Sequence, residues 1–192
     1  MRLLDVAGEL LDADGLERLS LRRIARRAGV SHGAPLRHYA SLAALLSALA
    51  ARGFRMLSEA IDKAGSRLPP GAGPLARLAA AGRGYVELAV AHPGLFALMF
   101  RREVLDPGSE ALQQASMAAF EELVRHVRAA QDAGWHAERE TRLLAGCMWA
   151  AVHGLATLWA EDALAFPTGA SYEDLLETTL VLVLGDQRGG TR

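Results

Sequence analysis

The amino-acid sequence predicts an all-α fold of about nine helices arranged in two domains. Apolar residues recur at three- and four-residue intervals along most of the chain, and no stretch alternates in the manner of a β-strand. Clusters of glycine and proline interrupt the helical pattern at several points. With 192 residues, 51% of them hydrophobic, the chain is long enough to bury a substantial core.

The N-terminal part is predicted to contain three short helices. The first begins near Leu3 and ends at Gly15. Ser20 is a good N-cap for the second helix, and Gly29 is a good stop at its C-terminus. The third is expected within residues 31–39.

Six further helices are predicted after this part. Ser41 caps the fourth, which runs to about residue 63, and Ser171 opens the ninth with a capping box. The helices between and including these two are expected over residues 41–63, 74–91, 93–100, 109–134, 137–162 and 171–185. We therefore divide the chain into a domain of residues 1–46, a domain of residues 47–186 and a disordered tail of residues 187–192.

Charge is distributed unevenly although the net charge is only -1. Residues 1–67 contain 11 basic and 7 acidic side chains, and the remainder contains 10 basic and 15 acidic ones. Eight arginines and no acidic residue lie between Arg18 and Ser58. A positive end on an acidic body is expected when only that end meets nucleic acid.

Composition also indicates the cellular compartment in which the protein works. The single cysteine, Cys147, excludes an intrachain disulfide and suits a reducing cytoplasm. Asp5 and Glu9 interrupt the apolar N-terminus, so we expect no signal peptide. Residues 143–160 carry no formal charge and approach the length of a membrane span. The two interpretations are a membrane span and a central helix that its own domain and a second subunit cover, and we favour the central helix.

The second predicted helix carries four arginines on one side. At about 100° per residue, its arginines lie opposite its apolar residues. These arginines are Arg22, Arg23, Arg26 and Arg27. No acidic residue lies three or four positions away on this helix, so its own ion pairs do not stabilise it. The alternatives are a solvated basic face and a surface that meets phosphate.

The segment that follows favours phosphate and base contacts. It presents Ser31, His32, Gly33, Ala34, Arg37, His38 and Tyr39. Small residues at a helix N-terminus let backbone N–H groups approach phosphate closely. Arg37 suits a phosphate or a guanine edge, His32 suits a base edge, and Tyr39 is expected to pack underneath. Together with Ser20 and the four arginines, these residues are the predicted DNA-binding site, over about residues 20–39.

The stretch IARRAGVSHGAPLRHYASLAALL resembles the helix–turn–helix of TetR-type transcriptional regulators. The matching positions are Ile24-Ala25, the run Ala28-Gly-Val-Ser31, and the ending Arg37-His-Tyr39. A second segment, Trp149-Ala-Ala-Val-His153-Gly154, resembles the C-terminal domain of the subgroup named for its Trp, His and Gly (WHG), and HPGLFALMF is common in TetR-type ligand domains. The resemblance implies a DNA-binding domain over residues 1–46 and a ligand-binding and dimerisation domain over residues 47–186.

Four features depart from the TetR-type pattern. Leu36 and Leu42 stand where the family usually has a tyrosine and a lysine that touch phosphate. Losing such contacts weakens DNA binding and flattens its salt dependence. Pro35 removes the first intrahelical bond if Ser31 is the N-cap of the third helix. Almost no chain precedes Leu3, so we expect no basic arm for the minor groove.

The resemblance implies a ligand pocket in the second domain, although each candidate residue taken alone is more simply explained as plain core. The candidates are Tyr85, Phe96, Met99, Phe100, Met117, Phe120, Trp149 and His153. Trp149 and His153 are favoured, because they lie four residues apart and each offers a hydrogen-bonding group in an apolar setting.

Two C-terminal helices are too apolar for the surface of a monomer, which indicates a four-helix bundle between two subunits. The predicted dimer interface consists of Leu155, Trp159, Tyr172, Leu175, Leu176, Thr179 and Val183. The alternative is an ordinary intrachain core. A dimer places two recognition helices about 34–36 Å apart, as a palindromic site requires.

These observations predict a cytoplasmic, homodimeric, ligand-responsive DNA-binding regulator. We expect a repressor that a small apolar or amphipathic molecule releases from a palindromic operator. The alternative, motivated by Leu36, Leu42 and the expected absence of a basic arm, is a helical small-molecule-binding or protein-interaction module that has lost specific DNA binding. Histidines and Cys147 lack metal-site spacing, and no nucleophile motif occurs, so we expect no metal, no cofactor and no enzyme activity.

Overall fold

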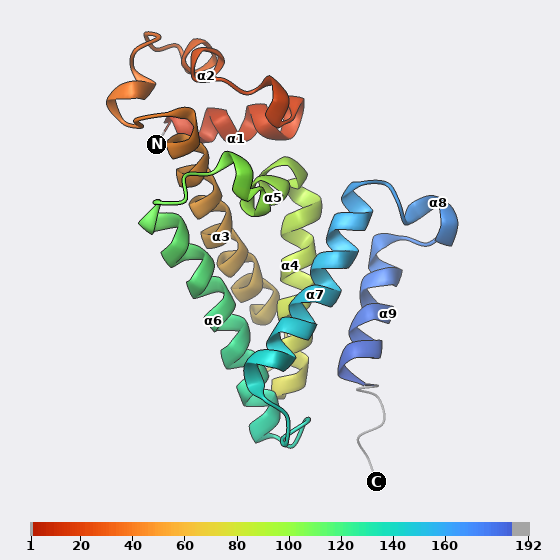
Figure 1. Cartoon of the computed structure of the whole chain (residues 1–192). Helices are drawn as coiled ribbons and strands as arrows, with labels where there is room; N and C mark the ends of the chain where they lie inside the picture. The colour runs from red at the N-terminus through yellow and green to blue at the C-terminus, as the bar shows by residue number, and fades with distance from the viewer. Residues whose placement is uncertain (1, 186–192) are drawn as a thin grey trace. The chain divides into compact units, whose positions relative to one another are not determined.

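The computed structural model describes residues 2–185, and every regular element within them is a helix (Figure 1). The α-helices are α1 (Arg2–Asp14), α2 (Leu21–Ala28), α3 (Leu42–Ser66), α4 (Pro74–Ala91), α5 (Pro93–Phe100), α6 (Glu110–Asp132), α7 (Thr141–Ala160), α8 (Ala165–Thr168) and α9 (Tyr172–Leu184). Three 3-10 helices are η1 (Leu16–Arg18), η2 (Pro35–Arg37) and η3 (Arg102–Val104). The predicted all-α class is confirmed. The predicted disordered tail lies outside the described residues.

The predicted helix caps are present. The hydroxyl oxygens of Ser20, Ser41 and Ser171 each accept the backbone N–H three residues further on, at 3.2, 3.1 and 3.1 Å. Gly29 ends α2 in the left-handed conformation, with φ of 68°. Local sequence therefore determines where these helices begin and where α2 ends.

The third predicted helix is not an α-helix. Residues 32–34 form a turn, and only the 3-10 helix η2 follows. Pro35 has no N–H with which to close an α-helical bond to the Ser31 carbonyl. The N–H of Ala34 donates to that carbonyl instead, at 2.9 Å, which is the tighter 3-10 pattern.

Two further differences concern the C-terminal half. Helix α7 begins at Thr141 and not near residue 137, because the Glu140 carboxylate accepts the N–H groups of Arg142 and Leu143 at 2.9 and 2.5 Å. Gly134, with φ of 97°, lies in the turn that precedes it. The interval between the predicted helices 137–162 and 171–185 contains the one-turn helix α8.

The chain forms two compact units. Among the described residues, the first comprises those up to Met56 together with His92–Met117, and the second comprises Leu57–Ala91 together with those from Ala118 onward. These units do not follow the predicted boundary between residues 46 and 47. Helix α3 contributes to both units, and α5 belongs with the N-terminal helices.

In the first unit, α5 is fastened to α1. The Asp12 carboxylate accepts the backbone N–H of Leu95 at 3.1 Å. A Cβ at Gly94 would lie 2.7 Å from the Leu11 carbonyl oxygen, so only glycine permits this close approach. On α3, the Phe54 ring contacts the edge of Phe100 at a centroid distance of 5.6 Å.

In the second unit, α4 packs against both α7 and α9. A Cβ at Gly84 would lie 2.7 Å from the backbone oxygen of Ala60, so this glycine lets α4 approach α3 closely. The Ser58 hydroxyl donates to the buried carboxylate of Glu122 at 2.7 Å, which ties α3 to α6.

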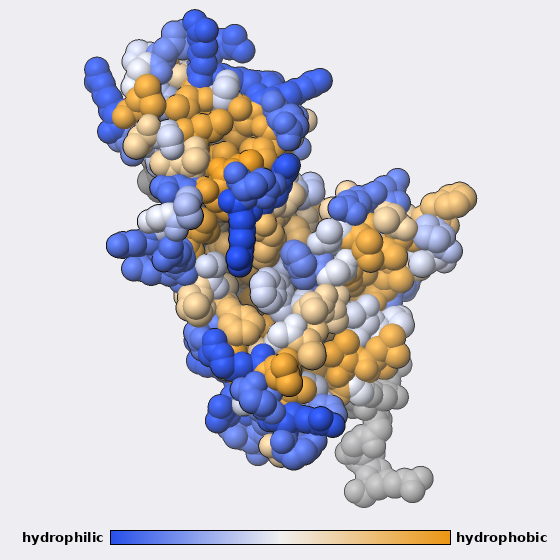
Figure 2. All heavy atoms as spheres, viewed as in Figure 1, coloured by the Kyte–Doolittle hydropathy of each residue, from blue (hydrophilic) through white to orange (hydrophobic). Residues whose placement is uncertain are grey.

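Helix α7 is the one described helix that is long and apolar enough to cross a membrane by length and composition. Only 28% of its most apolar window is buried within the chain. Figure 2 shows hydrophobic side chains gathered over the region of α7 and α9. An exposed apolar face therefore remains on this helix pair.

Candidate nucleic-acid interface and effector site

Helix α2 buries its apolar side and exposes its arginine side. Ile24, Ala25 and Ala28 are at most 1% exposed, and they hold the helix in the core of the first unit. The side opposite this buried face carries the arginines of the predicted DNA-binding site. Ser20 belongs to the same predicted site, but its side chain is used to cap the helix.

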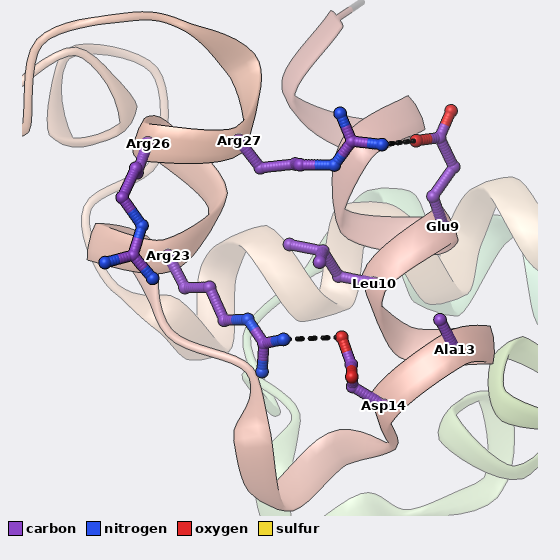
Figure 3. Close-up of a pocket in the computed structure, with 7 residues that line it drawn as sticks. All are labelled: Glu9, Leu10, Ala13, Asp14, Arg23, Arg26 and Arg27. Carbon is purple, nitrogen blue, oxygen red and sulfur yellow. Dashed lines mark hydrogen bonds and ion pairs between the residues drawn. The ribbon is translucent and has the colours of Figure 1, made fainter.

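Two of these arginines bind α1 (Figure 3). Arg23 forms an ion pair with Asp14 at 2.6 Å and also donates to the Arg18 carbonyl at 3.2 Å. Arg27 lies 3.9 Å from Glu9. Both partners come from another helix, so spacing along α2 could not reveal them.

The hollow between α1 and α2 is therefore a mixed-charge surface. It is lined by Glu9, Leu10, Ala13, Asp14, Arg23, Arg26 and Arg27. Arg26 extends from α2 without reaching either carboxylate in Figure 3. Within the described residues, neither Arg26 nor Arg22 forms an ion pair, which leaves these two guanidinium groups available for an external anion.

The segment after α2 presents most of its predicted contacts outward. Ser31, His32, Gly33, Arg37 and His38 are exposed, whereas Ala34 and Tyr39 are half-buried. Pro35 anchors the segment, because it is buried and its carbonyl accepts the N–H groups of His38 and Tyr39 at 3.0 and 2.9 Å. Partial burial raises the pKa of the Tyr39 phenol, as expected for a ring that packs underneath.

The eight ligand candidates fall into two groups, one in each unit. Phe96, Met99, Phe100 and Met117 lie in the first unit. Phe96 and Met99 are buried, and the Phe96 and Phe100 rings are 5.3 Å apart, next to Phe54. Met117 is 56% exposed. This group continues the core beside α3. Phe54 was not among the predicted ligand candidates, because it lies in a different predicted helix.

The other group forms a hydrogen-bonded aromatic cluster in the second unit. The indole Nε1 of Trp149 donates to the Tyr85 hydroxyl at 3.0 Å, and that hydroxyl lies 2.8 Å from Nδ1 of His153. Phe120 adds its ring at 5.9 Å from Trp149. Burial raises the pKa of Tyr85 and lowers that of His153, so both groups are neutral near pH 7.

Arg142 completes the polar edge of this cluster and was missed by sequence reasoning. Its guanidinium lies 5.3 Å from the centre of the Phe120 ring, a cation–π contact, and donates to Glu121 at 2.8 Å. The spacing of Arg142 and Trp149, two helical turns apart on α7, was the signal that could have found it.

Of the seven predicted dimer residues, two are buried and five are half-buried within the single chain. Leu155 and Leu176 are buried within the subunit, and Trp159 packs on Tyr172 at 5.9 Å between ring centroids. Leu175 and Val183 are half-buried, as is Thr179. The large apolar residues of α7 and α9 with the greatest exposure are others: Leu143, Leu158, Val181 and Leu182, at 69, 43, 48 and 79%. Trp149 of the aromatic cluster is also exposed, at 37%.

The geometry of α2 and the segment after it is that of a DNA-binding protein. A capped basic helix, a left-handed glycine turn and an exposed cationic segment form a helix–turn–helix of the kind used by DNA-binding regulators. A family described as "Bacterial regulatory proteins, tetR family" matches residues 3–49, and one described as "Tetracyclin repressor-like, C-terminal domain" matches residues 78–182. The chain therefore belongs to the tetR family, and it is a ligand-responsive DNA-binding transcriptional regulator.

Solved structures share this fold. A protein of unknown function from a Rhodococcus species is 35% identical, with 95% of this chain and 92% of that chain covered and a TM-score of 0.83. The tetR family transcriptional regulator PfmR from Thermus thermophilus is 20% identical over 100% of both chains, with a TM-score of 0.73. FadR from Bacillus subtilis, solved in complex with stearoyl-CoA, is 15% identical over 96% and 97%, with a TM-score of 0.68. No curated protein matches the sequence.

Proposed function

We propose that this protein is a cytoplasmic homodimeric repressor that leaves a palindromic operator when a small amphipathic molecule binds. The observation that carries the proposal is the exposed cationic surface of α2 and η2, which includes three arginines without an ion-pair partner in the described part of the chain. These are Arg22, Arg26 and Arg37. The protein acts by binding and not by catalysis.

The contacts divide between phosphate and base. Arg22 and Arg26 contact phosphate, because guanidinium groups form strong hydrogen bonds with phosphate oxygens. His32 and Arg37 reach base edges from the segment that Pro35 anchors. Arg23 and Arg27 hold α2 on α1, so their role is to position the interface.

The effector is assigned to the cluster of Tyr85, Phe120, Trp149 and His153. Aromatic walls with a few fixed polar groups suit a molecule that is mainly apolar but carries hydrogen-bonding atoms. The motif formed by Trp149, His153 and Gly154 resembles that of the WHG subgroup, and this resemblance supports membership of that subgroup. The stearoyl-CoA bound by the B. subtilis neighbour supports an amphipathic effector, although that protein shares only the fold.

The dimer is assigned to the exposed apolar face of α7 and α9. Leu143, Leu158 and Leu182 are large apolar residues that a monomer would leave in water. Small exposed residues between them, Cys147 and Ala150, allow two helices to approach closely. A two-fold axis at this face pairs identical surfaces, as a closed dimer requires.

Selection of bound sequences from a random duplex pool, at two salt concentrations, tests the proposal. We expect an enriched palindrome whose affinity falls steeply with salt, because each neutralised phosphate releases a counterion. An R22A/R26A variant should keep the sequence preference and lose about two units of the logarithmic salt slope. Binding without any enriched sequence would contradict the proposal and support the module that has lost specific DNA binding.

A further inference from the structure

One side chain in the proposed base-reading segment does not suit phosphate or a polar base edge. Leu36 is 56% exposed, on the same short element as Arg37. Single exposed leucines are common on protein surfaces, so exposure alone carries no meaning. The role of Leu36 depends on the direction in which η2 presents its side chain.

Leu36 is held outward by its neighbour. A 3-10 helix has three residues per turn, so consecutive side chains point about 120° apart. Pro35 is buried and its carbonyl accepts two backbone N–H groups, which fixes its side of η2 toward the core. Leu36 and Arg37 therefore both take outward positions.

The turn that leads into η2 carries a glycine. Gly33 lies three residues before Leu36, in the turn of residues 32–34. A Cβ at Gly33 would have no atom within 4 Å. A flat surface such as a base-pair edge can therefore approach the Leu36 side chain without obstruction at this glycine.

We propose that Leu36 reads the C5-methyl group of a thymine in the operator, an inference that rests on the proposed DNA binding. The thymine methyl is the apolar group that base pairs present in the major groove. Packing leucine against a phosphate or a polar base edge would remove water and give no hydrogen bond in return. Leu36 thus requires a thymine at one position of each half-site, close to the contact made by Arg37.

Replacing each thymine of the selected operator in turn with deoxyuridine tests this assignment, because only the methyl group is lost. At one half-site position we expect wild-type affinity to fall about fourfold, the factor for burying one methyl group. L36A should bind the thymine and deoxyuridine duplexes equally. V90A, which changes an exposed valine on α4, should keep the wild-type discrimination.

A second substitution separates the methyl group from the base pair. Cytosine at the sensitive position should bind weakly, and 5-methylcytosine should recover about fourfold with wild type but not with L36A. The assignment is overturned if no thymine is sensitive to loss of its methyl, or if L36A keeps the same sensitivity. Those results would leave operator binding intact, whereas a wild-type protein that selects no DNA overturns the proposed function itself.

Discussion

The hydroxyl of Tyr85 lies 2.8 Å from Nδ1 of His153 and accepts the indole N–H of Trp149 at 3.0 Å. The indole can only donate, so the Tyr85 oxygen accepts from Trp149, and the same oxygen lies within hydrogen-bonding distance of the His153 ring. Burial lowers the pKa of His153, which favours its neutral form. One hydroxyl on α4 therefore links to two side chains on α7.

This arrangement predicts a loss of stability in acid. Burial lowers the pKa of His153, and also that of His126, below the ordinary value of about 6.5. The unfolded chain then binds more protons, so the free energy of unfolding should decrease as pH falls below about 6.5. Urea unfolding between pH 8 and pH 5 measures this dependence. A free energy of unfolding that rises toward pH 5 would contradict the assignment.

Removing the Tyr85 hydroxyl should cost stability at neutral pH. Y85F removes a hydroxyl that both the Trp149 indole N–H and the His153 ring contact in a part-buried cluster, which should cost about 1 kcal/mol. Urea unfolding at pH 7.5 measures the change. Y172F is the matched control, since the Tyr172 hydroxyl lies outside this network; it should change the unfolding free energy by less than about 0.5 kcal/mol.

The arginines of α2 should separate by role. R23A breaks the ion pair with Asp14 and should lower the unfolding free energy by about 1 kcal/mol, at the upper end for a pair that is partly exposed. R22A should leave stability unchanged and weaken operator binding. Thermal unfolding and fluorescence anisotropy on both variants provide the comparison. If R23A is as stable as wild type, Arg23 does not position α2 on α1.

Close packing of α4 on α3 should make Gly84 intolerant of a side chain. G84A places a Cβ 2.7 Å from the Ala60 oxygen and should destabilise the protein by about 1–3 kcal/mol. G65A makes the same change near the end of α3, where no atom lies within 4 Å, and should be neutral or slightly stabilising. Chemical denaturation tests both; a neutral G84A would show that the two helices separate easily.

The exposed face of α7 and α9 should control dimerisation. L182E introduces a carboxylate at a position that is 79% exposed in the single chain. An unpaired charge buried in an interface is costly, so the dimer dissociation constant should rise by about two orders of magnitude or more. Sedimentation measures this change, with V90E as a control on α4. If L182E leaves the dimer dissociation constant unchanged, the interface lies elsewhere.

Local signals were sufficient for much of the fold. Serine caps at residues 20, 41 and 171 and the glycine stop at residue 29 were predictable, because each acts on backbone groups within a few residues. The 3-10 form of η2 also has a local cause in Pro35. The extent to which one proline shortens a helix depends on its burial, which the sequence alone does not define.

Nonlocal contacts limited the prediction of the site. The side of α2 was predicted correctly, but the partnership of Arg23 with Asp14 joins two helices and leaves no mark in the spacing of either. The ligand candidates were predicted by residue type, which cannot show that Phe96 and Trp149 belong to different units. The predicted dimer residues include Leu155 and Leu176, which are buried within the single chain, because an apolar period shows a face of a helix and not what covers it.

Replacing Arg37 bears most on how this surface recognises DNA, and the affinity of R37A for the selected operator measures the effect. Arg37 is exposed on η2 and has no ion-pair partner in the described part of the chain, so its loss should not alter folding. We predict an unchanged melting temperature and an affinity reduced about 5- to 150-fold, the range for one specific base contact of about 1–3 kcal/mol. An R37A protein that binds the operator as tightly as wild type would contradict the account of how this surface recognises DNA.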